Sequence, residues 1–136
     1  MLGIIDRQPR VYLAGPMRGL PNFGFEAFAA GAALLRAHGY EVFSPAERDE
    51  NRHNPRMFKG TGDITKIEGK KGFSLREVLK ADMDWITDKA DAVVLLPGGE
   101  NSKGATAERA LALALEAAIP PCRVLTLEEA LAAQPA

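Results

Sequence analysis

The sequence lacks several features that mark common classes of protein. Cys122 is the only cysteine among the 136 residues, so no disulfide can form within the chain and a reducing, cytoplasmic location is expected. The net charge is −1, whereas proteins that bind nucleic-acid polymers usually carry a basic surplus. The first residues become charged too soon for a secretory signal, and no apolar run approaches the roughly 20 residues that span a membrane. We therefore expect neither a nucleic-acid polymer nor a membrane as a partner.

Motifs for metals and common cofactors are absent from the sequence as well. Two distant histidines, His38 and His53, and a single cysteine do not form a zinc-binding set. Neither the phosphate-binding pattern GxxxxGK followed by Ser or Thr nor the dinucleotide-binding pattern GxGxxG occurs. The sequence thus predicts no metal and no cofactor, and it gives no support to ATP-driven chemistry or hydride transfer.

The sequence does contain an alternation of β and α patterns in a chain of single-domain length. Apolar stretches predict strands over Arg10–Gly15, Tyr40–Ser44, Ala92–Pro97 and Arg123–Thr126. Helical patterns cover Phe25–His38, Ser74 to about Lys89, Gly104–Ala118 and Leu127–Ala133. This order predicts one α/β domain over residues 1–136, with a doubly wound parallel sheet of four or five strands and helices on both faces. Ligands of such folds bind beyond the carboxyl ends of the strands.

The stretch from about Glu47 to Gly72 is polar, charged and dotted with glycine. It shows no clear periodicity, so we expect a polar loop or lid at about 47–72, or a disordered segment. His53 lies within this stretch, beside Arg52 and Arg56. A lid that contacts an anionic substrate and a plain solvated loop are both compatible with this composition.

Two carboxylates lie where core residues are expected. At about 100° per residue, Asp82 falls in the middle of the apolar face of its helix, and Glu108 falls on the apolar stripe of the next helix. An unpaired buried carboxylate costs on the order of several kcal/mol, so such residues are normally neutralised, ion-paired or open to a polar pocket. The pair therefore indicates either a shared functional cavity or structural ion pairs, for instance with Arg18 or Lys103.

The residues just before Glu108 form a candidate anion site. Ser102, Lys103 and the backbone N–H group of Gly104 lie at the N-terminus of the predicted helix, where free N–H groups and the helix dipole attract anions. Simple N-capping by Ser102 explains the same residues. Both interpretations are compatible with one another.

The loop after the first strand is a second candidate for ligand contact. Gly15 at the strand end allows a ligand to approach the backbone closely. Arg18 either contacts a phosphate group or is a solvated surface charge. Gly19 and Asn22 follow in the same loop.

Three segments occur in order along most of the chain. They are VYLAGPMRG at residues 11–19 with Asn22 and Phe23 following, ADMDWI at residues 81–86, and LLPGGENSKGATAE at residues 95–108. Each segment is short, but the ordered set resembles the nucleoside 2-deoxyribosyltransferases and the related 2′-deoxynucleoside 5′-monophosphate N-hydrolases. The chain is most similar to the small members of this superfamily that are often found in phage genomes.

The resemblance implies a flavodoxin-like sheet, a homo-oligomer and a small-molecule nucleoside or nucleotide substrate. Glu108 matches the catalytic glutamate of the superfamily, which attacks C1′ of the sugar, and Asp82 matches the aspartate that assists departure of the base. The residues expected to bind the substrate all lie in these matching segments: Tyr12, Gly15, Arg18, Gly19, Asn22, Ser102, Lys103 and Gly104. Transferases that resemble this chain carry an aspartate at position 102, whereas the monophosphate hydrolases carry a serine there, so Ser102 favours a 5′-monophosphate.

The expected reaction is therefore cleavage of the N-glycosidic bond of a 2′-deoxynucleoside 5′-monophosphate, with release of the free base. Three alternatives stay open. The first is base exchange between deoxynucleosides by a 2-deoxyribosyltransferase. The second is a phosphoribohydrolase, whose PGGxGTxxE motif this chain echoes with three additional residues. The third is a non-catalytic protein that binds nucleotides.

Overall fold

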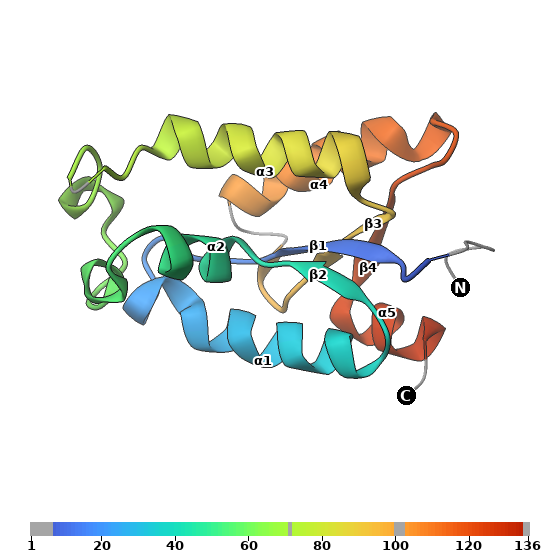
Figure 1. Ribbon diagram of the computed structural model, residues 1–136, viewed down its shortest axis with the longest axis horizontal. Helices are drawn as coiled ribbons and strands as arrows, with labels where there is room; N and C mark the ends of the chain where they lie inside the picture. The colour runs from blue at the N-terminus through green and yellow to red at the C-terminus, as the bar shows by residue number, and fades with distance from the viewer. Residues whose placement is uncertain (1–6, 71, 100–102, 135–136) are drawn as a thin grey trace.

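The computed structural model describes residues 7–70, 72–99 and 103–134, and strands and helices alternate through these ranges (Figure 1). The strands are β1 (Arg10–Ala14), β2 (Glu41–Phe43), β3 (Ala92–Leu95) and β4 (Arg123–Thr126). The α-helices are α1 (Phe25–Ala37), α2 (Pro45–Arg52), α3 (Leu75–Lys89), α4 (Lys103–Ala114) and α5 (Leu127–Ala133). Short 3-10 helices are η1 (Pro21–Gly24), η2 (Pro55–Phe58), η3 (Ile64–Lys66) and η5 (Leu115–Ala117).

The four strands form one parallel sheet in the order β2-β1-β3-β4. The predicted α/β, doubly wound fold is confirmed, and the order matches the first four strands of the flavodoxin-like arrangement. The chain runs from β1 outward to β2 and from β3 outward to β4, so the direction of winding reverses between β1 and β3. Folds of this kind bind ligands at that reversal, outside the carboxyl ends of the strands.

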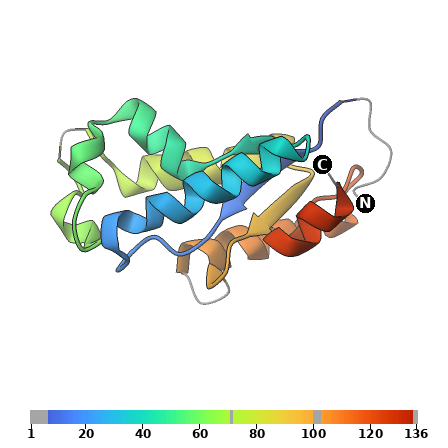
Figure 2. The ribbon, with the colours of Figure 1, turned by 90° about the horizontal axis from the view of Figure 1, so that it is seen from below.

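Helices cover both faces of the sheet. Helices α3 and α4 lie on one face and α1 and α5 on the other, as Figure 1 shows and as the view from below confirms (Figure 2). The segment between β2 and α3 lies at one end of the molecule. The carboxyl end of the sheet is therefore flanked by a segment that belongs to neither helical layer.

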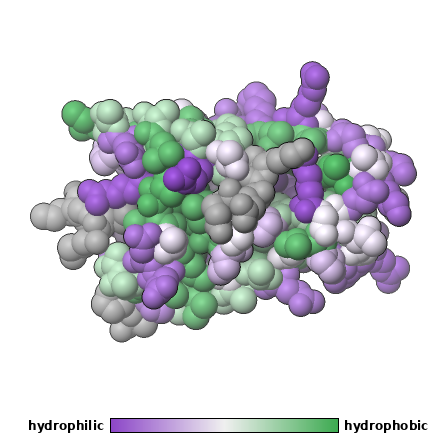
Figure 3. Space-filling model, turned by 180° about the vertical axis from the view of Figure 1, so that it is seen from behind, coloured by the Kyte–Doolittle hydropathy of each residue, from purple (hydrophilic) through white to green (hydrophobic). Residues whose placement is uncertain are grey.

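The outer surface keeps some apolar side chains. Viewed from behind, a band of apolar residues lies between groups of polar ones (Figure 3). Leu34, Leu113 and Ile119 are exposed, and Ile119 is 99% accessible. Among the described residues, no helix combines the length and the apolar character needed to cross a bilayer.

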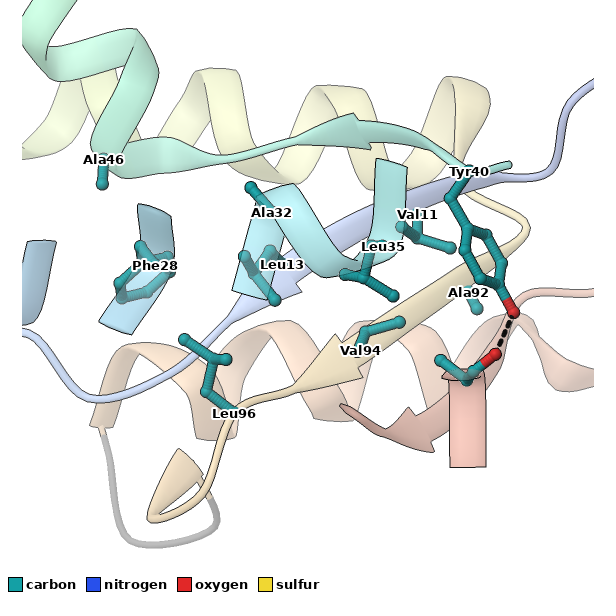
Figure 4. Close-up of a cluster of buried hydrophobic side chains, with 11 residues drawn as sticks. Val11, Leu13, Phe28, Ala32, Leu35, Tyr40, Ala46, Ala92, Val94 and Leu96 are labelled. Atoms are coloured by element: carbon teal, nitrogen blue, oxygen red, sulfur yellow. Dashed lines mark hydrogen bonds between the residues drawn. The ribbon is translucent and has the colours of Figure 1, made fainter. Parts of the chain in front are cut away.

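The sheet separates two of the apolar clusters of the interior. On the side of α1 and α5, Leu13, Phe28, Leu35 and Val94 are completely buried (Figure 4). Tyr40 lies in the same cluster, and its hydroxyl donates a hydrogen bond of 2.6 Å to the carbonyl of an α5 residue. The opposite cluster contains Tyr12, Ile86, Val93, Ala112 and Cys122. Because β1 and β3 are covered on both faces, both strands consist of apolar residues after Arg10.

Helix ends follow their sequence signals. The Ser74 hydroxyl caps α3, because it accepts a hydrogen bond of 3.3 Å from the Glu77 N–H. Helix α1 ends at Ala37, and Gly39 follows its C-cap with a φ of 90°, which favours glycine. The predicted helix over residues 104–118 is shorter as an α-helix, since it tightens into η5 in its last turn before Pro120 and Pro121.

The prediction of a polar loop at 47–72 is wrong for its first part. Helix α2 occupies residues 45–52, with Ser44 as N-cap and Pro45 in the first turn. The rest of the stretch contains η2 and η3, joined by irregular chain. Arg48 and Asp49 on α2 are only 9% and 5% exposed. Because these buried residues are charged, the sequence of α2 shows no hydrophobic periodicity.

Backbone and side-chain hydrogen bonds join residues 60–62 to the loop after β1. The Gly19 N–H donates to the Gly62 carbonyl at 2.9 Å, and Asn22 and Gly60 exchange two hydrogen bonds of 2.8 and 2.9 Å. Gly62 has a φ of 80°, and a Cβ atom there would lie 2.3 Å from the carbonyl oxygen of Leu20. Only glycine fits this contact, so the two loops meet through their backbones.

Candidate active site

A cavity of about 500 Å³ opens where the winding of the sheet reverses. Its walls include Tyr12 of β1, Gly15 just after β1, Arg48 of α2, Asp82 of α3 and Glu108 of α4. The volume lies within the range of small-molecule sites. The cavity therefore joins residues from four elements at the place where this fold usually binds its ligand.

Glu108 is buried, as the helical pattern predicts, with 6% of its surface exposed. Its carboxyl group accepts a hydrogen bond from the hydroxyl of Tyr12, which is itself completely buried. The Tyr12 ring stacks on Phe43 with centroids 5.4 Å apart. Strand β1 thus fixes the hydroxyl that orients the Glu108 carboxyl.

Asp82 is also buried, with 5% of its surface exposed. It forms a salt bridge to Arg48, and Arg48 also contacts Asp49 at 3.0 Å. The Arg48 guanidinium lies 5.7 Å from the centre of the Phe43 ring. An ion pair to Asp82 therefore exists among the described side chains, and its partner is Arg48 of α2.

The surroundings of the two carboxyl groups shift their acidity. Burial raises the pKa of Glu108 from 4.5 to about 8, opposed by the hydrogen bond from Tyr12 and reinforced by the negative charge of Asp82. Burial also raises the pKa of Asp82, while Arg48 and a hydrogen bond from Tyr12 act in the opposite direction. Perturbed acids that share a cavity are typical of functional sites.

Aromatic side chains form another wall of the cavity. Phe23, Phe58 and Phe73 pack edge to face, with centroids 6.2 and 5.9 Å apart in successive pairs. The ring centroids of Phe25 and Phe58 are 5.1 Å apart. The His53 ring packs against Phe58 and Phe73 but does not line the cavity. Such a wall offers flat apolar surfaces to a planar ring.

The structure brings together most of the predicted site residues whose side chains it describes. Tyr12, Gly15, Arg18 and Gly19 line the cavity with Asp82 and Glu108, and Arg18 is exposed. Asn22 does not line this cavity but a smaller one beside it. Lys103 and Gly104 belong to the first turn of α4, where the structure describes the backbone only. Ser102 lies outside the described residues.

The model of the family described as "Domain of unknown function (DUF4406)" matches residues 9–120. The chain belongs to the DUF4406 family. None of the curated proteins in the comparison matches it. The DUF4406 match runs from the start of the sheet to the turn after η5, so it includes Tyr12, Arg48, Asp82 and Glu108.

Arg48 lines this cavity, and the sequence analysis did not identify it. It lies in a run of eight helical residues, PAERDENR, that contains only one alanine and one proline as apolar residues. The available signal was the start of the helix: Ser44, Pro45 and Glu47 occupy the N-cap, first and third positions typical of a helix N-terminus. Among the described residues, no group of three or more His, Cys, Asp or Glu side chains could hold a metal ion.

Proposed function

We propose that the protein cleaves the N-glycosidic bond of a 2′-deoxynucleoside 5′-monophosphate and releases the free base. The observation that carries this proposal is a pair of buried carboxyl groups, Glu108 and Asp82, that face one cavity from different helices. Glu108 is the nucleophile that attacks C1′ of the sugar. Asp82 protonates the base as it leaves.

The chemistry suits two carboxyl groups with different partners. Breaking the C1′–N bond gives the sugar oxocarbenium character, which a nearby carboxylate stabilises or captures as a covalent intermediate. The leaving base needs a proton, and a buried acid can hold one near neutral pH. Tyr12 orients Glu108, and Arg48 holds Asp82 in place.

The lining of the cavity supports a nucleotide as the ligand. A planar base suits the wall built from Phe23, Phe58 and Phe73. The phosphate suits the exposed Arg18, which lines the same cavity with Gly15. The resemblance to the monophosphate N-hydrolases, through Ser102 and the glutamate six residues later, supports a 5′-monophosphate.

Base exchange between deoxynucleosides is the second candidate, because it uses the same glutamate and replaces water by a second base. An assay with a panel of deoxynucleosides and their 5′-monophosphates, with and without added free base, distinguishes these reactions. We expect free base and deoxyribose 5-phosphate from a monophosphate. Formation of new nucleosides alone would instead indicate a transferase, and binding without turnover would indicate a nucleotide-binding protein.

A further inference from the structure

The cavity lining contains one packed set of apolar side chains. Its six members line the cavity and pack together, and we call them the apolar compartment: Phe23, Phe58, Ile64, Ile67, Phe73 and Val78. The described polar side chains of the lining belong to other residues: Tyr12, Arg18, Arg48, Asp49, Asp82 and Glu108. None of the side chains of the apolar compartment can donate or accept a hydrogen bond. They therefore bind a ligand group through stacking, shape and the exclusion of water.

Helix α3 carries the lining from the apolar compartment to Asp82. Val78 and Asp82 both line the cavity and lie one turn apart on the same face of α3, or about 6 Å along the helix axis. The Arg48 guanidinium contacts both positions, since it pairs with the Asp82 carboxylate and donates to the Val78 carbonyl at 3.4 Å. The apolar compartment therefore begins beside the ion pair of Asp82.

The backbone that presents Phe23 to the cavity is strained. Asn22 and Phe23 have φ values of 54° and 56°, in the left-handed region that a bulky aromatic residue rarely adopts. The two hydrogen bonds between Asn22 and Gly60 hold this turn in place. The turn sets the Phe23 ring edge to face with Phe58, with centroids 6.2 Å apart. Such outliers cluster at ligand-binding sites, so the strain favours a binding role for this wall over core packing alone.

We propose that the apolar compartment binds the base of the substrate and selects bases that carry an alkyl group, as thymine does and uracil does not. This inference rests on the proposed function, because that function places the base beside Asp82. An alkyl group that enters the compartment leaves water for apolar surroundings, which strengthens binding about fourfold for each CH2 group. A hydroxyl in the same place loses its hydrogen bonds to water and gains none from the side chains of the compartment.

Titration calorimetry with matched pairs of nucleotides tests the selection. Each pair differs by one methyl group on the base: 2′-deoxyuridine and thymidine 5′-monophosphate, and 2′-deoxyadenosine and N6-methyl-2′-deoxyadenosine 5′-monophosphate. In the pair whose parent binds more tightly, the methylated nucleotide should have a Kd about fourfold lower. Equal Kd values within that pair, or no binding of any of the four nucleotides, would overturn the proposal.

The polarity of the substituent is tested with two groups of nearly equal size. The ethyl and hydroxymethyl derivatives of the same parent base differ in that a hydroxyl replaces a methyl group. Because a hydroxyl buried in the apolar compartment has no partner there, the hydroxymethyl nucleotide should bind about tenfold more weakly than the ethyl one. Equal or tighter binding of the hydroxymethyl nucleotide would contradict an apolar site for the substituent.

Val78→Thr introduces a hydroxyl into the compartment and keeps the shape of the side chain. It should abolish most of the preference for the ethyl over the hydroxymethyl nucleotide. Val42→Thr is the matched control, since Val42 of β2 packs in the cluster around Leu13 and Leu35, outside the described cavity lining, and the ratio of Kd values should stay as in the wild type. If circular dichroism shows that Val78→Thr does not fold, Ile64→Thr places the hydroxyl on η3 instead. A folded variant of either kind with the wild-type ratio would refute the role of the compartment.

Base release from the same nucleotides separates this inference from the proposed function. Cleavage at equal rates, with equal Kd values for the alkylated nucleotide and its parent, would leave the proposed function standing and overturn the selection by the apolar compartment. Tighter binding of the alkylated nucleotide without release of any base would support the compartment and overturn the proposed hydrolysis. We expect both tighter binding and faster base release at low concentration for the alkylated nucleotide.

Discussion

Replacing Glu108 by glutamine should remove a pH-dependent loss of stability from the fold. The pKa of Glu108 is about 8 in the folded protein and near 4.5 when the side chain is exposed in the unfolded chain. Between these values the unfolded chain has released the proton and the folded protein retains it. The free energy of unfolding therefore falls as pH rises through this interval, and it becomes level once the folded form has also ionised.

The magnitude follows from the width of the interval. At about 1.4 kcal/mol per pH unit, the contribution that is present below pH 4.5 and lost above 8 amounts to at most about 5 kcal/mol. About 3 kcal/mol of it is lost by pH 7. This is a large part of the roughly 5–15 kcal/mol that stabilises an ordinary domain. Glutamine has nearly the same shape, accepts a hydrogen bond from Tyr12 and does not ionise, so the variant should escape this loss.

Urea unfolding followed by circular dichroism at pH 5, 6, 7 and 8 measures the effect. The wild-type free energy of unfolding should fall more steeply with pH than that of Glu108→Gln, and the variant should be the more stable protein at pH 8. Glu116→Gln is the control, because Glu116 is exposed on the neighbouring η5 and its replacement should leave the wild-type slope in place. Parallel curves for the wild type and Glu108→Gln between pH 5 and 8 would refute the reasoning.

Three further predictions concern the site and its assembly. Ser102→Asp should weaken cleavage of monophosphates far more than cleavage of nucleosides in parallel assays, because it sets a carboxylate against phosphate; equal losses would argue against a phosphate at this position. Arg48→Met should lower the free energy of unfolding by about 3–5 kcal/mol in urea titrations, since it leaves Asp82 without its charged partner, and a loss below about 1 kcal/mol would contradict a role in the ion pair. Light scattering should detect a homo-oligomer whose site borrows residues from a neighbouring copy, and a monomer that remains fully active at nanomolar concentration would rule out the shared site.

The sequence pattern was sufficient to predict the layers of the fold and the two buried acids. Asp82 and Glu108 stand out because they interrupt apolar stripes at helical spacing, and a stripe reports burial whatever residue occupies it. The strands were equally visible, since β1 and β3 are covered on both faces and therefore consist of consecutive apolar residues.

The wall formed by residues 45–73 could not be predicted in the same way. Helix α2 buries Arg48 and Asp49, so its inner face is charged and carries no hydrophobic period. Phe58, Ile67 and Phe73 are buried but stand far apart in a polar stretch, where their packing depends on contacts with Phe23 across the loop after β1. Partners so distant in sequence leave no local pattern.

Base release from a 2′-deoxynucleoside 5′-monophosphate by the wild type and by Glu108→Gln tests the central claim most directly. The variant keeps the hydrogen-bond acceptor for Tyr12 and loses the nucleophile, so it should remain folded and bind the nucleotide. The account predicts free base from the wild type and a rate lower by several orders of magnitude from the variant. A folded Glu108→Gln protein that releases base at close to the wild-type rate would contradict it.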